Sequence, residues 1–298
     1  MLAEKIKQLR KQAKLSQEQL AEKLNVSRQA VTKWETGAGI PDIENLRSIA
    51  ALFQISLDDL LENRDTGSKP QDFLFESTTE YDIDGLKNYD ITFMGANSVI
   101  LSGYEGEKIR IRLASNQITG LQNSFKVKLD DIKHKIDIDI KRISSVSETA
   151  AKASLFIFIY LPLNYAGIAE LSGNTASLEI RGMNLERIEF SGKVSSVILC
   201  DSDTHMELNS NEDMEISCQN FSGRLDINQL SSTSRLFLPD GLIFQTVTKG
   251  IANRILFVKD GTETEEFPLR GQGDSLSQVT IELNGVKSEL VIASAQSV

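Results

Sequence analysis

Two histidines and two cysteines are the side chains in this sequence best suited to nucleophilic or metal chemistry. His134 and His205 lie far apart along the chain, and neither stands beside a plausible nucleophile or a set of metal ligands. Cys200 and Cys218 have no histidine partners, so they are expected to be buried small residues, with a redox-sensing pair as the alternative. The pattern predicts no enzyme activity, no catalytic residue, no cofactor and no metal site.

An acidic cluster in the same region could hold a cation. Its members are Asp201, Asp203, Glu207, Glu212, Asp213 and Glu215. The acidic positions alternate with apolar ones such as Leu208 and Ile216, which favours the solvated face of a β-sheet over a binding site.

Charge is distributed unevenly along the 298 residues. The net charge is −10, yet residues 1–41 carry eight basic and four acidic side chains, whereas residues 65–298 hold a net −11. Only the N-terminal part is therefore suited to a polyanion. The longest apolar run, 155–163, is about half of the ~20 residues that a membrane span needs, and the N-terminus has no apolar signal core. We expect a cytoplasmic protein without membrane contact.

Residues 1–62 have the apolar period of helices. Ser16 and Gln19 form a capping-box pattern that opens a second helix, and Ser27 is a good N-cap for a third, from 28 to about 36. A fourth helix follows Pro41, and a fifth follows Ser56. Only three residues separate the second helix from the third, which predicts a helix-turn-helix geometry.

The segment 16–61, SQEQLAEKLNVSRQAVTKWETGAGIPDIENLRSIAALFQISLDDLL, resembles the phage-repressor (Xre-type) helix-turn-helix family along its whole length. The resemblance rests on Gln17, the Val26–Ser27 turn, Trp34–Glu35 with Gly37, and Pro41. It covers about a fifth of the chain. It implies a five-helix bundle that binds double-stranded DNA and regulates transcription, by family analogy as a repressor.

The resemblance also implies that the third helix reads bases, because Val31 and Trp34 take the inward positions of its turns. The expected base contacts are Arg28, Gln29, Thr32 and Lys33. Arginine can bridge O6 and N7 of guanine, and glutamine can bridge N6 and N7 of adenine.

Two further sets of residues follow from the same resemblance. Gln17 and the backbone at Ser27 lie at helix N-termini, where phosphates are favoured. Arg10 and Glu35 occupy the positions where the family commonly has a structural ion pair, so we assign them to architecture. One unit reads about half of a typical site, so a homodimer on a roughly palindromic operator is expected.

The remainder of the chain has a different pattern. Residues 63–71, NRDTGSKPQ, predict a flexible linker between domains 1–62 and 72–298. Apolar residues alternate with charged ones in 108–115, 125–129 and 134–143, which indicates half-buried strands. The chain is thus predicted to be a multidomain α + β protein with an all-β C-terminal domain.

Short strands recur about every ten residues between 168 and 240, with glycine, asparagine or aspartate between them. Each is too short to bury its own apolar face, so neighbouring segments must stack. The pattern favours a β-solenoid, with a β-sandwich as the alternative. It resembles the bacterial DUF4097-type, adhesin-like repeat proteins. Segment 154–160 is apolar on both faces and needs a cover, supplied either by the earlier hairpins or by a second subunit.

Three functions fit these features to different degrees. The first is a DNA-binding regulator whose β domain oligomerises or senses a protein or small-molecule effector. The second is a scaffold whose β-solenoid assembles and whose helical domain docks a partner. The third, a carbohydrate-active enzyme, is disfavoured because such enzymes are usually exported and no signal peptide is found.

Overall fold

The computed structural model describes residues 2–12, 15–53, 73–143, 146–259, 262–265 and 279–294 of the chain. It divides into two compact units, Met1–Gln71 and Asp72–Val298, which we call the helical unit and the β unit. The predicted boundary after residue 62, the linker 63–71 and the fifth helix after Ser56 lie outside the described residues.

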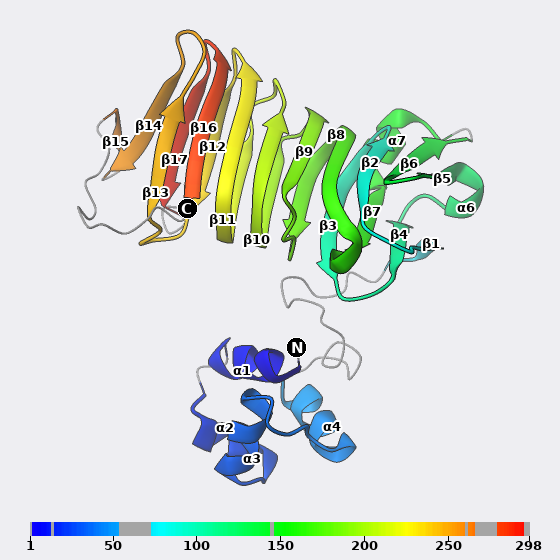
Figure 1. The fold of residues 1–298 in the computed structure, drawn as a ribbon, viewed down its shortest axis with the longest axis vertical. Helices are drawn as coiled ribbons and strands as arrows, with labels where there is room; N and C mark the ends of the chain where they lie inside the picture. Colours follow the sequence, from blue (N-terminus) through cyan, green and yellow to red (C-terminus); the bar gives the residue numbers. More distant parts are fainter. Residues whose placement is uncertain are drawn as a thin grey trace. The chain divides into compact units, whose positions relative to one another are not determined.

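The described part of the helical unit contains the first four predicted helices (Figure 1). They are α1 (Leu2–Gln12), α2 (Gln17–Leu24), α3 (Arg28–Glu35) and α4 (Ile43–Phe53). The predicted capping box is present: the Ser16 hydroxyl accepts from the Gln19 N–H at 3.1 Å, and Gln19 Oε1 accepts from the Ser16 N–H at 2.8 Å. It satisfies two backbone donors at the start of α2 that the helix itself leaves without a partner.

The core of the helical unit takes one fully buried apolar side chain from each helix. These are Ile6, Leu20, Val31 and Ile49. Trp34 joins them with 7% of its surface exposed. Burial of Val31 and Trp34 fixes the rotation of α3 about its axis, because these two side chains must face the other helices.

The β unit is built almost entirely from strands. They are β1 (Phe75–Asp82), β2 (Lys87–Phe93), β3 (Ala96–Tyr104), β4 (Lys108–Ser115), β5 (Phe125–Ile132), β6 (Lys135–Arg142), β7 (Phe156–Pro162), β8 (Ala166–Arg181), β9 (Arg187–Lys193), β10 (Ser196–Asn209), β11 (Glu215–Leu230), β12 (Thr233–Leu238), β13 (Phe244–Thr248), β14 (Arg254–Lys259), β15 (Thr262–Thr264), β16 (Val279–Val286) and β17 (Glu289–Ser294). Two short helices, α6 (Leu121–Ser124) and α7 (Glu148–Ser154), and the 3-10 turn η1 (Leu163–Tyr165) interrupt them. The large β region is as predicted from the alternating patterns, and the helices are additions to it.

Parallel pairing between segments 18 to 20 residues apart in the chain organises the middle of the β unit (Figure 1). Ile168 of β8 pairs with Arg187 of β9, and Ser196 of β10 pairs with Glu215 of β11, each 19 residues further along the chain. The predicted spacing of about ten residues is half of this step, so each step contributes two strand segments. Inward side chains such as Leu199 and Ile216 are fully buried, as stacking of the short apolar segments requires.

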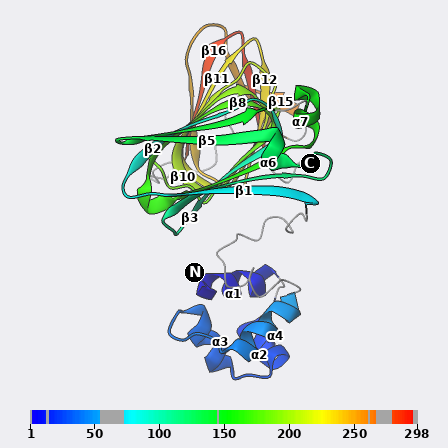
Figure 2. The ribbon, with the colours of Figure 1, turned by 90° about the vertical axis from the view of Figure 1, so that its right-hand side faces the viewer.

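The order of strands in the stack differs from their order in the chain at both ends. β16 lies between β11 and β13, and β17 pairs with both β12 and β14. At the other end β2 lies between β6 and β8, and β3 pairs with both β7 and β8. Figure 2 views the β unit from the end that carries β1, β5 and α6. Both ends therefore depend on contacts between segments that are distant in sequence.

The strand that is apolar on both faces, β7, is covered unequally. Ile157 and Ile159 are fully buried in the core, whereas Phe156 and Phe158 on the other face are half-buried. The ring of Phe73 lies 4.8 Å from Phe156 and 5.9 Å from Phe158, centroid to centroid. The second face is therefore covered in part by residues of the β unit itself.

Candidate nucleic-acid interface

The turn between α2 and α3 is set by local geometry. Asn25 ends α2 in the left-handed conformation, with φ of 55°, which asparagine tolerates better than most residues. The Ser27 hydroxyl accepts from the Ala30 N–H at 3.2 Å and so caps α3. Because the side chain is occupied in this way, the backbone N–H groups of the first turn are what α3 can offer to an anion.

The four predicted base contacts share one surface. Arg28, Gln29, Thr32 and Lys33 are all exposed. They alternate along α3 with Val31 and Trp34, which are buried. An α-helix with its side chains is about 10–12 Å in diameter, which suits the width of the DNA major groove, about 12 Å. The structure thus brings together on one exposed helix face the polar side chains that can hydrogen-bond to base edges.

A hydrogen-bonded network behind this face was not foreseen from the sequence. Thr32 Oγ1 donates to Gln17 Oε1 at 3.2 Å and to the carbonyl oxygen of Arg28 at 3.0 Å. Gln17 Nε2 donates to Glu35 Oε2 at 2.8 Å. The side-chain amide of Gln17 therefore links the start of α2 to Thr32 and Glu35 of α3.

Arg10 and Glu35 form a bidentate pair between α1 and α3. Arg10 Nε lies 2.6 Å from Glu35 Oε1 and Arg10 Nη2 lies 2.9 Å from Glu35 Oε2, while Arg10 Nη1 donates to the carbonyl oxygen of Leu15. The side chains are 13% and 2% exposed. Burial by itself would raise the pKa of Glu35, but the hydrogen bonds from Arg10 and Gln17 outweigh it and hold this pKa below its usual value.

This lowered pKa predicts acid sensitivity of the helical unit. A carboxylate with a depressed folded-state pKa stabilises the fold above its unfolded pKa, about 4.5, and that contribution is lost as the pH falls through the folded value. We expect the free energy of unfolding to fall as the pH is lowered below about 4.5. The fluorescence of Trp34, the sole tryptophan of the sequence, measures this unfolding. Glu35→Gln should flatten this part of the profile. An equally steep profile in that variant would assign the acid sensitivity to other groups.

Arg28 has an acidic neighbour on α2. Its Nε lies 3.8 Å from Glu18 Oε2, with the two side chains 65% and 61% exposed. A pair this exposed contributes little free energy, so Arg28 can leave it for a base edge at small cost. Spacing alone did not reveal this pair, because Glu18 and Arg28 belong to different helices.

The cysteines and one of the histidines of the β unit show no reactive arrangement. Cys218 pairs in register with Leu199, one residue before Cys200, so the two thiols point to opposite faces of the sheet. The redox-pair alternative is therefore wrong. Burial raises the pKa of Cys218 to about 12 and that of Cys200 to about 11, which keeps both protonated. His134, expected in a strand, is exposed in the turn between β5 and β6.

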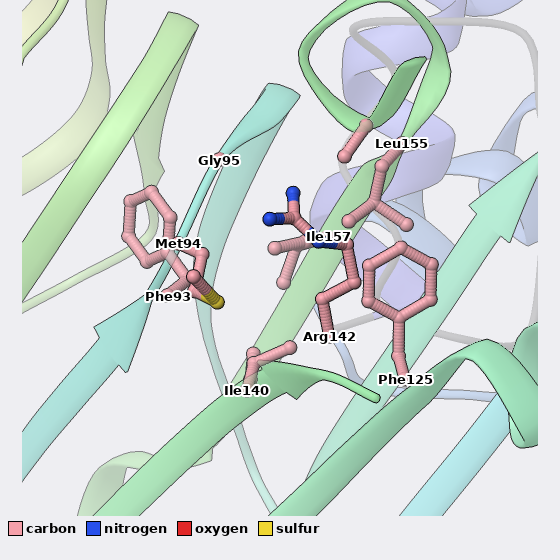
Figure 3. A pocket seen from close by; sticks show the side chains of 9 residues that line it. Phe93, Met94, Gly95, Phe125, Ile140, Arg142, Leu155 and Ile157 are labelled. Carbon is pink, nitrogen blue, oxygen red and sulfur yellow. The ribbon is translucent and has the colours of Figure 1, made fainter. Parts of the chain in front are cut away.

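Two hollows of the β unit differ in size and chemistry. One of about 10 Å³ lies among Phe93, Phe125, Ile157 and other apolar side chains, with Arg142 as the one charged lining residue (Figure 3). That is room for about one water molecule. The other, an open depression of about 880 Å³, is lined by mainly polar residues of β10 and β11 and by the loop 239–242. Only the second has the volume of an organic ligand.

Comparison with known proteins finds a family match within the helical unit. Residues 6–60 match the helix-turn-helix family. The transcriptional activator BcrR of Enterococcus faecalis is 48% identical over 62 residues, which are 21% of this chain and 30% of that protein. The uncharacterised regulator YqaE of Bacillus subtilis is 39% identical over 72 residues, 24% of this chain and 62% of YqaE. The regulator ImmR of Bacillus subtilis is 29% identical over 134 residues, 45% of this chain and 98% of ImmR. The chain thus spans less than two thirds of the first two relatives.

Solved structures similar to this chain align with about three quarters of its length. A candidate cell adhesion protein from Clostridium sporogenes matches 74% of this chain and 99% of its own at 10% identity and a TM-score of 0.35. A candidate adhesin from Bacteroides fragilis matches 74% and 96% at 11% identity and a TM-score of 0.27. TM-scores this low do not establish a shared fold.

Among the described residues, no helix has the length and apolarity needed to cross a membrane.

Proposed function

We propose that the chain is a sequence-specific transcriptional regulator that reads DNA through α3. The observation that supports it most is the exposed face of Arg28, Gln29, Thr32 and Lys33, held outward by buried Val31 and Trp34 in a unit that matches the helix-turn-helix family. Helices of this class place their N-terminal residues against base edges in the major groove.

Each residue of this face has a distinct part in the proposal. Arg28 and Gln29, on the first turn, contact bases through their forked side chains. Lys33 adds a positive charge further along, and Thr32 is oriented by Gln17. The backbone N–H groups at Ser27 and Gln17 bind phosphates, since both residues stand at helix N-termini.

Arg28→Ala should relax the base preference and weaken binding to the best sequence by about 1–3 kcal/mol, roughly 5- to 150-fold, because a bidentate base contact is lost. Competition binding with a panel of single-base operator variants measures both effects. Arg235→Ala is the matched control: it removes the same charge from a 56% exposed side chain of the β unit. If the Arg28→Ala and Arg235→Ala variants bound the operators with equal affinity and the same base preference, Arg28 would not contact a base.

The operator is proposed to be roughly palindromic and bound by a homodimer, because one helix-turn-helix unit reads only half a site. Selection of genomic fragments by the full-length chain should enrich one or a few sites with two-fold symmetry, and light scattering of the complex should count two chains per site. Enrichment of no sequence would favour the scaffold function. A single chain per site, with no two-fold symmetric protection of the DNA, would refute the proposed homodimer.

The proposed direction of control is repression. A bound dimer needs only to occupy promoter DNA to block transcription, whereas activation also needs a surface that contacts the polymerase. The name of BcrR, an activator 48% identical to this chain over 62 residues, points the other way. A reporter under the selected operator, measured with and without the regulator, decides: expression that rises with the regulator present would reverse the assignment.

For the β unit we propose a two-strand-per-coil β-solenoid that serves oligomerisation or the sensing of an effector. Parallel pairing at a step of 19 residues supports the solenoid, whereas a sandwich would be built from antiparallel pairs. The half-buried Phe156 and Phe158 are candidates for a subunit contact, and the depression beside the loop 239–242 is the candidate effector site.

A further inference from the structure

A histidine and two carboxylates meet on the outer face of the β unit. His205 and Glu207 stand two residues apart on β10, so they share a face of the sheet, and Asp226 of β11 pairs in register with Glu207. His205 Nε2 lies 2.9 Å from Asp226 Oδ2 and 3.6 Å from Glu207 Oε1. The three possible ligand atoms all lie within 4.8 Å of one another.

We propose that His205, Glu207 and Asp226 form a binding site for a divalent transition-metal ion of the Zn²⁺ type. One imidazole nitrogen and two carboxylate oxygens are a donor set that such ions accept, and three protein ligands leave a coordination position for water or a further ligand. Ligand atoms around a tetrahedral zinc ion are roughly 3.4 Å apart, so small side-chain rotations bring these atoms into place. The spacing of His205 in the sequence predicted no metal site, because Asp226 comes beside it only through stacking.

The surrounding side chains leave the ligand atoms available. Asp226 uses Oδ1 for Arg224 at 2.7 Å and Oδ2 for His205, so an ion that replaces the histidine contact keeps the arginine contact. Arg187 Nη1 lies 3.5 Å from Glu207 Oε1, which is long for a hydrogen bond, so this contact is weak. Arg224 can therefore orient the Asp226 carboxylate from behind, as outer-shell partners of metal ligands do.

Charge on this face also favours a cation. Five acidic residues are successive register partners on neighbouring strands: Glu170, Glu189, Glu207, Asp226 and Glu282. Three cations pair with them, Arg187, Arg224 and Lys249, which leaves a net charge of −2 with neutral histidine. Asp226 and Glu282 are nearly buried, with side chains 9% and 4% exposed, so their negative charge is poorly screened by solvent.

The two histidines of the chain provide an internal control for the test. Untagged full-length protein, freed of metal with a chelator, is titrated with Zn²⁺ by calorimetry. In parallel, the histidines are modified with diethylpyrocarbonate, with and without Zn²⁺, and quantified by mass spectrometry. We expect one ion per chain and protection of His205 but not of His134, which is exposed in its turn. His205→Ala should weaken binding at least tenfold, and His134→Ala should leave it unchanged.

Stability gives a further readout that does not depend on DNA binding. An ion that bridges β10 and β11 binds only the folded β unit, so Zn²⁺ should raise the thermal midpoint measured by far-ultraviolet circular dichroism in the wild type and in His134→Ala, but not in His205→Ala. If Zn²⁺ protected both histidines equally or neither, or if His205→Ala bound it as tightly as the wild type, the site would be refuted. The protection experiment uses the unaltered chain, so it stands even if a variant fails to fold.

Discussion

Glu35→Ala should destabilise the helical unit by about 3–5 kcal/mol and weaken specific DNA binding. The substitution leaves Arg10, 13% exposed, without the bidentate partner that compensates its charge, and it deprives Gln17 of an acceptor. Breaking a buried ion pair by removing one partner costs about 3–5 kcal/mol. A unit of this size has a total stability of roughly 3–9 kcal/mol, so the loss is a large share of it.

The distribution of aromatic residues lets this effect be localised. Trp34 is the sole tryptophan of the sequence and is buried in the helical unit, so its fluorescence follows unfolding of that unit alone. Denaturant titrations should shift the fluorescence transition of Glu35→Ala and leave the circular dichroism transition of the strands in place. Glu22→Ala, which removes an exposed carboxylate of α2, should stay within about 0.5 kcal/mol of the wild type. Wild-type fluorescence stability in Glu35→Ala would contradict the structural role of the pair.

Gly192→Ala should destabilise the β unit by about 3 kcal/mol or more. Gly192 has a φ of +150°, and a β-carbon built on it would lie 1.8 Å from the carbonyl oxygen of Gly173 on the neighbouring strand. The two glycines pair in register, so the close approach belongs to the stacking itself. The methyl group can be accommodated only if β8 and β9 separate locally, which costs backbone strain and ladder hydrogen bonds.

Gly85→Ala is the matched control, because a β-carbon there meets nothing within 4 Å and the residue lacks a positive φ. Circular dichroism at a strand wavelength should report a large loss of stability for Gly192→Ala and a small change for Gly85→Ala. The fluorescence of Trp34 should be the same in both. Equal strand transitions would show that the spacing of β8 and β9 tolerates a side chain.

Several elements could be predicted because their signals are local. The pairs Ser16–Gln19 and Ser27–Ala30 join residues three apart, and Asn25 supplies its own left-handed turn. Alternating residues in 108–115 and 134–143 likewise marked β4 and β6. Interactions of this range depend on neighbours in the sequence and hardly at all on the remaining fold.

Contacts between distant segments could not be predicted in the same way. Gln17 contacts Thr32 and Glu35 because α2 packs on α3. The spacing of these residues in the sequence does not identify them as partners. The short helix α7, which begins after the cap Ser147, was also missed, since seven residues give too weak a period within a region of strands.

By itself the sequence determined a helix-turn-helix unit with an outward polar face on 28–33 and a large β region, although the short segments expected near 168 and 178 form one strand, β8, of 16 residues. The tertiary structure alone decided that β16 lies between β11 and β13, that Gln17 supports α3, and that Asp226 comes beside His205. The physical reason is range. Caps and apolar periods act over a few residues and are written in the local sequence, whereas the partner of a strand edge or a charged side chain is selected only when the whole chain has packed.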